Sequence, residues 1–203
     1  MDFAWLAGVT GFAFAMSATP GPNNTMVAAS GASYGVARSL PLMAGIGMGV
    51  AGIMLVVAAF GASLVADPRI GAALKWIGIA YLLWLAWKIA MAEPSAPDAA
   101  SAAGSKPLSF IQGALFQIVN PKLWVMVSGA VVTYGQAASG MTGYTLAVLF
   151  AFIFGFMTSI STVAWTALGA SVARFLTSRR SVRIFNGVMA ALLVASLIPV
   201  ILG

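Results

Sequence analysis

Long apolar stretches separated by short polar segments dominate the chain. No charged residue lies between Asp2 and Arg38, or between Arg38 and Asp67. About 20 apolar residues are enough to cross the hydrocarbon core of a bilayer as a helix. The pattern therefore predicts an all-α integral membrane protein with six transmembrane helices, at residues 3–36, 40–65, 70–91, 108–135, 143–173 and 183–202.

One longer polar segment divides the chain into two halves. Residues 92–107 are rich in Ala, Ser and Pro and are too polar to pack as a membrane helix. We expect this cytoplasmic linker to separate a first three-helix repeat, 1–91, from a second, 108–203. An odd number of helices per half inserts the two halves in opposite orientations, which is the inverted-repeat design of many secondary transporters. Both halves contain Pro and Asn followed by Ser-Gly-Ala, although small residues are common in any membrane helix.

Composition excludes several classes of protein. Hydrophobic residues make up 61% of the chain and charged residues 7%, which does not fit a soluble globular domain. The net charge is +6, but the basic residues lie singly at the ends of apolar stretches or in one short loop, so nucleic acid is not an expected partner. Cysteine and histidine are both absent, and we expect no disulfide, no metal site and no other cofactor.

The distribution of Lys and Arg predicts the orientation in the membrane, since cytoplasmic loops are enriched in both. One side carries most of them: Arg38, Lys88, Lys106, Arg174, Arg179, Arg180 and Arg183. The other side carries Arg69 and Lys75. The first side is therefore predicted to be cytoplasmic, with both termini in the periplasm or its equivalent.

The first apolar stretch is too long for one plain helix, because residues 3–37 would extend about 50 Å. A break is predicted where two prolines and a glycine occur together, in Thr19-Pro20-Gly21-Pro22-Asn23-Asn24. Such a break exposes the amide groups of the following helix, whose partial positive charge suits a carboxylate. Asn23 and Asn24 can cap this helix or donate to a ligand. The alternative is a plain proline kink relieved by neighbouring helices.

The fourth stretch repeats this arrangement with Gln117, Asn120, Pro121 and Lys122. A lysine deep in a membrane helix costs about 2.5–3.5 kcal/mol and usually faces a cavity and a partner. The alternative is that Lys122 extends to a membrane interface. No acidic residue lies deep in any predicted span, so a substrate carboxylate is the expected counter-ion, and a cationic substrate side chain would lack one. The sequence leaves open whether the breaks are kinks or re-entrant hairpins.

Hydroxyl side chains in the fifth stretch are candidates for lining a transport pathway, in particular Thr158, Ser159 and Thr162. The alternative is that these hydroxyls bond to carbonyls of their own helix or of a neighbour. In the second stretch, Gly45 and Gly49 are spaced for close helix packing.

The motif Thr19–Asn24, followed by Ser30–Gly35, and the motif Phe116–Lys122 resemble the lysine exporter (LysE) superfamily, in particular its threonine and homoserine exporter (RhtB) branch. The resemblance covers the whole chain. It implies efflux of amino acids across a bacterial inner membrane, driven by an ion gradient with protons as the coupling ion, often as a homodimer. Exporters of basic amino acids would be expected to carry acidic residues within the spans. Their absence favours neutral substrates such as threonine, homoserine, serine or leucine.

The expected substrate-binding residues are those of the two breaks, with backbone amides and Lys122 holding the carboxylate: Thr19, Pro20, Gly21, Pro22, Asn23, Asn24, Gln117, Asn120, Pro121 and Lys122. Lys122 is also the one deep titratable candidate for proton coupling. Two other classes of membrane protein are alternatives. A membrane-embedded enzyme would have only a Ser–Lys pair available as nucleophile, and a channel or an exporter of another solute would lack charged rings and soft metal ligands.

Overall fold

The structure, a computed structural model, describes residues 2–64, 68–91, 107–135, 142–176, 178–198 and 201. The predicted linker lies outside these residues except for Pro107, and so does Lys106. The described residues form helices and no strand, as predicted. The elements are α1 (Phe3–Ala18), α2 (Pro22–Leu64), α3 (Pro68–Ala90), α4 (Phe110–Phe116), the 3-10 helix η2 (Gln117–Val119), α5 (Pro121–Tyr134), α6 (Gly143–Ala173) and α7 (Arg179–Ala195).

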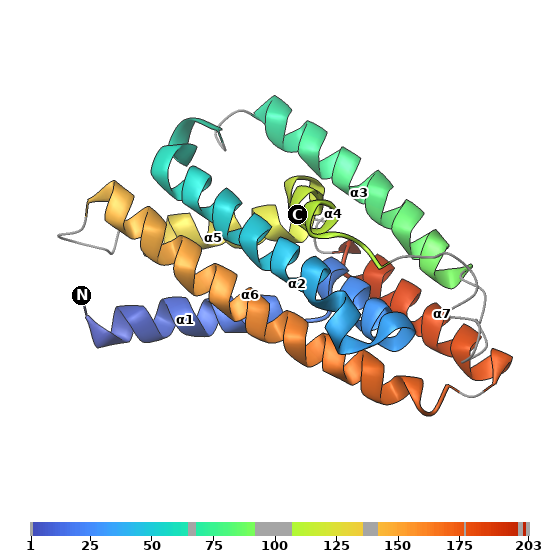
Figure 1. Cartoon of the computed structure of the whole chain (residues 1–203). Helices are drawn as coiled ribbons and strands as arrows, with labels where there is room; N and C mark the ends of the chain where they lie inside the picture. The colour runs from blue at the N-terminus through green and yellow to red at the C-terminus, as the bar shows by residue number, and fades with distance from the viewer. Residues whose placement is uncertain are drawn as a thin grey trace.

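Helix α6 runs along the bundle, with α1 beside one part of it and α2 packed extensively against it (Figure 1). Helix α3 packs on α7, and α4 packs on α2. Buried apolar side chains form two clusters: one joins α1, α2, α5 and α6, and the other joins α2, α3, α4 and α7. The first half of the chain is therefore interleaved with the second.

Helix α2 bends sharply at Gly35, which has φ 77° and ψ 171°. The Ser30 and Ser39 hydroxyl oxygens lie 2.8 Å apart across this bend. In a straight helix, nine residues would separate them by about 13.5 Å. The chain thus turns back on itself, and residues 22–34 and 36–64 form two arms. The sequence predicted this boundary between the spans 3–36 and 40–65, at Arg38 to Pro41, but these residues are helical. The turn lies at Gly35 instead, because glycine tolerates the positive φ that the turn requires.

Glycines bring helices into close contact at two places. A Cβ at Gly45 or Gly49 would meet the backbone of α4, at Phe110 and Ala114 respectively. A Cβ at Gly169 would meet the backbone of α2 at Ala28. Close packing predicted for the Gly45 and Gly49 pair is therefore present, and α4 is the helix that uses it.

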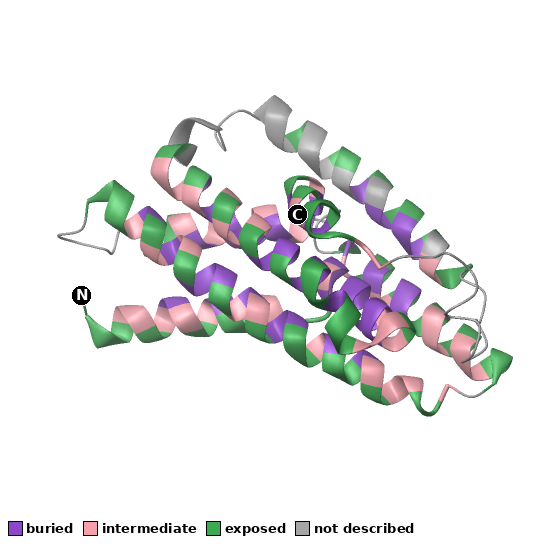
Figure 2. Cartoon of the chain, viewed as in Figure 1, coloured by how far each residue is buried: buried purple, intermediate pink, exposed green. Residues whose placement is uncertain are grey.

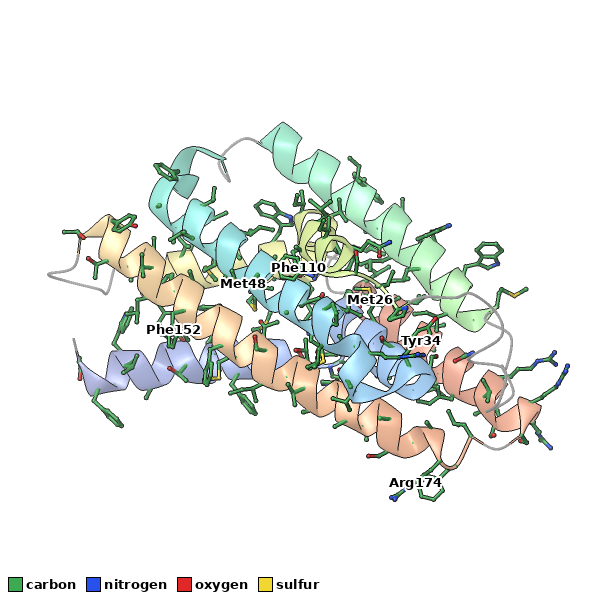
Figure 3. The ribbon with its side chains drawn as sticks, in the orientation of Figure 1. Met26, Tyr34, Met48, Phe110, Phe152 and Arg174 are labelled. Atoms are coloured by element: carbon green, nitrogen blue, oxygen red, sulfur yellow. The ribbon has the colours of Figure 1, made fainter. Side chains whose placement is uncertain are left out.

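The outer surface of the bundle is apolar. Phe152, Phe156 and Ile160 are 67%, 51% and 42% exposed and share one face of α6. Figure 2 shows exposed positions along α6, and Figure 3 labels Phe152 on this helix. Soluble proteins rarely expose such a continuous apolar face. Contact with lipid accounts for it.

By length and composition, two helical stretches of the described chain can cross a membrane, Pro22–Phe60 and Gly143–Ala173. The pair Phe110–Val119 and Pro121–Tyr134, bent by 66°, is a third if its two parts form one span. The breaks predicted at the two proline motifs are present. The arrangement as six spans in two inverted repeats stays a prediction.

Candidate functional site

The first break separates α1 from α2. Helix α1 ends at Ala18, and Thr19, Pro20 and Gly21 are non-helical before α2 begins at Pro22. The last carbonyl groups of a helix have no partner within the helix. The amino-terminal end of α2 and the carbonyl end of α1 therefore meet inside the bundle.

Side chains from two other helices bond the carbonyl groups at the end of α1. The Asn24 amide nitrogen donates to Ser17 O at 2.7 Å and to Thr19 O at 2.8 Å. From α6, the Ser161 hydroxyl donates to Ser17 O at 2.7 Å, and the Trp165 indole donates to Ala18 O at 3.2 Å. Helix α6 thus fixes the end of α1.

The second break is centred on Asn120, which ends η2 and caps α5. Its side-chain oxygen accepts from Lys122 N at 3.2 Å, and Pro121 occupies the first turn of α5, where no amide donor is needed. The chain bends by 66° at this point. This local chemistry follows directly from the Asn-Pro pair.

Amide side chains from the two breaks form one cluster. The Asn23 amide donates to Gln117 Oε1 at 3.0 Å, and the Gln117 amide donates to Asn23 Oδ1 at 2.9 Å. The Asn120 amide donates to both oxygens, at 3.1 Å to Gln117 and 3.4 Å to Asn23. Gln117 and Asn120 are 0% and 2% exposed. The structure therefore brings together residues 97 positions apart in the chain.

Lys122 extends from α5 to the carbonyl end of α1. Its Nζ donates to Thr19 O at 2.8 Å, to Thr19 Oγ1 at 2.7 Å and to Pro20 O at 3.4 Å. A cation is favoured there, since the carbonyl end of a helix carries a partial negative charge. The sequence predicted a cavity and a partner for this lysine, with a substrate carboxylate as its counter-ion. In the structure its partners are oxygens of the exposed residues Thr19 and Pro20 at the first break.

A cavity of about 30 Å³ lies between the two breaks. Its wall combines residues from α1, α2, α5 and α6 with the non-helical segments at both breaks: Met16, Ser17, Gly21, Pro22, Asn23, Asn24, Asn120, Lys122, Leu123, Met126 and Thr158. This volume holds about two water molecules. An amino acid needs more room, so the cavity is too small to hold one in this structure.

Of the predicted binding residues, Gly21, Pro22, Asn23, Asn24, Asn120 and Lys122 line the cavity. Thr19 and Pro20 contact it through Lys122, and Gln117 through Asn23 and Asn120. Pro121 is buried at the start of α5. Both motifs thus converge on one place.

The three hydroxyls predicted to line a pathway separate in the structure. Thr158 is in the cavity wall and shares a hydrogen bond of 3.2 Å with Ser17. Ser159 donates to Gly155 O, and Thr162 donates to Ser159 O, so both bond within α6. Among the described residues, these two hydroxyls follow the alternative that the sequence left open.

Sequence reasoning did not single out the apolar part of the wall, Met16, Leu123 and Met126. Methionine and leucine are so common in membrane helices that no pattern marks these three. It also missed Ser161 and Trp165 as the residues that hold the end of α1. A position one helical turn from Thr158 was the available indication for Ser161.

Within the described residues, the one acidic side chain is remote from the cavity. Asp2 is the one acidic residue in the described part of the chain, and it caps the far end of α1, a helix of 16 residues. That length places it about 24 Å from the break. No cluster of three or more His, Cys, Asp or Glu side chains that could hold a metal occurs among the described residues. The cavity wall thus combines one cation, Lys122, with neutral polar and apolar residues.

Comparison with known proteins shows a family and several relatives. The family model described as LysE type translocator matches residues 14–197, which include both breaks. The cysteine/O-acetylserine efflux protein of Escherichia coli (strain K12) is 36% identical over 181 residues, which cover 87% of each chain. Proteins of that name from Shigella flexneri and Shigella sonnei (strain Ss046) match with the same identity and coverage. No solved structure matches the chain.

The match spans more than half of the chain, and the identity to these relatives extends across nearly all of it. The apolar outer surface agrees with a membrane protein. The chain therefore belongs to the LysE type translocator family, whose members are transporters rather than enzymes.

Proposed function

We propose that this protein exports small neutral amino acids from the cytoplasm across the bacterial inner membrane. The observation that carries the proposal is the cavity between the two helix breaks, with a cation and three asparagine side chains in its wall. Helix breaks of this kind form the substrate sites of many secondary transporters, because they offer free backbone groups at membrane depth. The carboxylate of the amino acid would be held by Lys122 and the amides of the cavity.

The charge of the wall supports a neutral side chain on the substrate. A guanidinium or a second ammonium would need a buried carboxylate, and no acidic residue lies among those that line the cavity. Met16, Leu123 and Met126 offer an apolar surface for a short side chain. The relatives are named for cysteine and O-acetylserine efflux, so we place these two beside threonine, homoserine, serine and leucine as candidates.

Transport would follow alternating access, in which the cavity enlarges and opens to one side of the membrane at a time. The resemblance to the RhtB branch supports a proton gradient as the driving force and a homodimer as the assembly. The predicted position of the amino terminus outside is supported by Arg174, which lies at the opposite end of the bundle from that terminus (Figures 1 and 3). Basic residues favour the cytoplasmic side.

Counterflow in proteoliposomes tests this function. Vesicles loaded with unlabelled amino acid should take up labelled L-cysteine or O-acetyl-L-serine faster than unloaded vesicles, because a carrier returns faster when loaded. L-lysine and L-arginine should give no stimulation. Uptake that does not depend on internal substrate would instead indicate a channel, and stimulation by L-lysine alone would contradict the proposed substrate class.

Two variants connect the counterflow to the cavity. Lys122→Met and Lys122→Gln remove the charge in the wall, and we expect both to lower counterflow at least tenfold, because a substrate carboxylate would lose its cation. Arg174→Gln removes a cation from an exposed residue at the end of α6 and should leave counterflow within twofold of the unmodified protein. Undiminished counterflow in both Lys122 variants would remove this lysine from the proposed site.

A further inference from the structure

We propose that the carbonyl end of α1 is the subsite for the substrate's ammonium group. In this structure the ammonium group of Lys122 occupies that subsite in place of the substrate's. This inference rests on the proposed function and adds to it the position of the second charged group of the substrate. It also gives Lys122 two alternating partners. One is the end of α1, and the other is the substrate carboxylate.

The hydrogen bonds of Lys122 define the subsite. Three oxygen atoms surround Nζ: Thr19 O, Thr19 Oγ1 and Pro20 O, at 2.8, 2.7 and 3.4 Å. A lysine ammonium has three N–H donors and no acceptor, so these contacts use its donors completely. The α-ammonium of an amino acid carries the same three N–H donors on one nitrogen. The group that Lys122 presents to Thr19 and Pro20 is thus the group that every amino acid substrate carries.

The neighbouring carbonyl groups explain why the ammonium lies at Thr19 and Pro20. Ser17 O is bonded by Asn24 and Ser161, and Ala18 O by Trp165. These three donors are neutral side chains, and of them only Asn24 lines the cavity. Thr19 O, which also accepts from Asn24, and Pro20 O are the carbonyls that a cation bonds. The partial negative charge at this end of α1 is thus directed at one ammonium.

The subsite adjoins the cavity at Gly21. Gly21 and Lys122 are both in the cavity wall, and a Cβ at Gly21 would lie 2.9 Å from both Nζ and Cδ of Lys122. The lysine side chain therefore lies directly over this glycine. A ligand in an enlarged cavity would approach the oxygens of Thr19 and Pro20 along the same side.

Exchange keeps every charge paired. While its donors are bonded to α1, Lys122 cannot also donate to a carboxylate. An amino acid supplies both groups that the change needs: its ammonium replaces Lys122 at Thr19 and Pro20, and its carboxylate receives the released lysine. A ligand with an ammonium alone would leave Lys122 without a counter-ion in a cavity that holds about two water molecules, which is costly. The site would thereby select zwitterions.

The experiment measures thermal unfolding of the detergent-solubilised full chain with two probes. L-cysteine carries both charged groups, and cysteamine carries only the ammonium; the chain has no cysteine with which either could form a disulfide. The unmodified protein should be stabilised by L-cysteine, by about 2 °C or more at saturating ligand, and not by cysteamine. In Lys122→Met the preference should reverse, because the oxygens of Thr19 and Pro20 are vacant and the carboxylate has no cation. Tetramethylammonium, which has no N–H donor, should stabilise neither protein.

A second variant covers the case in which Lys122→Met does not fold. Gly21→Ala retains the lysine and pushes its flexible end away from α1, so cysteamine should stabilise Gly21→Ala but not the matched variant Gly11→Ala, where a Cβ meets no atom within 4 Å. Equal responses to cysteamine in the unmodified protein and in Gly21→Ala or Lys122→Met would overturn the inference, because a purely structural lysine would change the melting temperature and not the ligand preference. Absence of counterflow with all six candidate amino acids in the unmodified protein would overturn the proposed function instead, and the cysteamine result would still decide on the subsite.

Discussion

Asn23 and Gln117 form a reciprocal pair in which each side-chain amide donates to the oxygen of the other, at 3.0 and 2.9 Å. The two residues are 94 positions apart and belong to the two helix breaks. Gln117 also donates to Gly113 O at 3.1 Å, so its amide has both donors bonded. The pair therefore joins the two halves of the chain at the wall of the cavity.

A double-mutant cycle on this pair should show strong coupling. We expect Asn23→Ala and Gln117→Ala each to destabilise the protein by about 1–3 kcal/mol, because each removes both hydrogen bonds of the pair and leaves an amide donor unpaired, on the buried Gln117 or on the half-buried Asn23. The double variant should lose less than the sum, with a coupling of about 1 kcal/mol. Thermal or denaturant unfolding of the four proteins in detergent measures this term. Additive losses would show that the reciprocal pair does not form.

The positions of the two breaks could be predicted from the sequence, because their causes are local. Two prolines around Gly21 remove amide donors from a stretch too long for one helix. The pair Asn120 and Pro121 is sufficient to end one helix and begin the next. The residues chosen for the site were those of the breaks. Six of them line one cavity because the fold brings the two breaks together.

The partners of these residues could not be predicted, because they depend on tertiary contacts. No sequence pattern distinguishes Ser161, which bonds the end of α1, from Ser159, which bonds its own helix. The same limit applies to Lys122. Its depth in an apolar stretch predicted a partner, but the backbone oxygens at Thr19 and Pro20 have no signature in the sequence.

The close approach of α2 and α6 predicts different effects for two glycines on α2. A Cβ at Gly31 would meet the backbone at Thr166, whereas a Cβ at Gly52 would meet no atom within 4 Å. Gly31→Ala should therefore cost about 1–3 kcal/mol by overpacking, and Gly52→Ala should stabilise the helix by about 0.5–1 kcal/mol. Thermal unfolding of both variants in detergent provides the test. Equal melting temperatures would contradict the packing described for these helices.

The bend in α2 predicts that Gly35 tolerates no side chain. Its φ of 77° with ψ of 171° lies in a region that is essentially restricted to glycine, and other residues there cost about 1–3 kcal/mol. Gly35→Ala should lower the melting temperature by several degrees. Gly187→Ala on α7, where a Cβ has no close neighbour, is the matched control and should not. If Gly35→Ala and Gly187→Ala have the same melting temperature, the turn between the two arms has another conformation.

Ser161 and Ser159 offer a comparison of two serines on one helix. The Ser161 hydroxyl donates across to Ser17 O on α1 at 2.7 Å, and it lies 3.2 Å from Asn24 Oδ1, at hydrogen-bond distance. The Ser159 hydroxyl donates to Gly155 O within α6. Hydrogen bonds between membrane helices contribute about 0.6 kcal/mol on average and up to about 1.7 kcal/mol. Ser161→Ala should lose stability within that range and also reduce counterflow several-fold, because the carbonyl end of α1 next to the cavity becomes less well fixed.

Ser159→Ala should change both quantities little, since its helix carbonyl retains a backbone donor. The measurement compares melting temperature and counterflow for the two variants at equal amounts of reconstituted protein. If Ser161→Thr, which keeps the hydroxyl, retains the melting temperature and the counterflow of the unmodified protein, the effect is due to the hydrogen bond and not to the volume of the side chain. A Ser159→Ala variant that loses as much counterflow as Ser161→Ala would instead place the substrate path along the α2-facing side of α6, away from the cavity between the breaks.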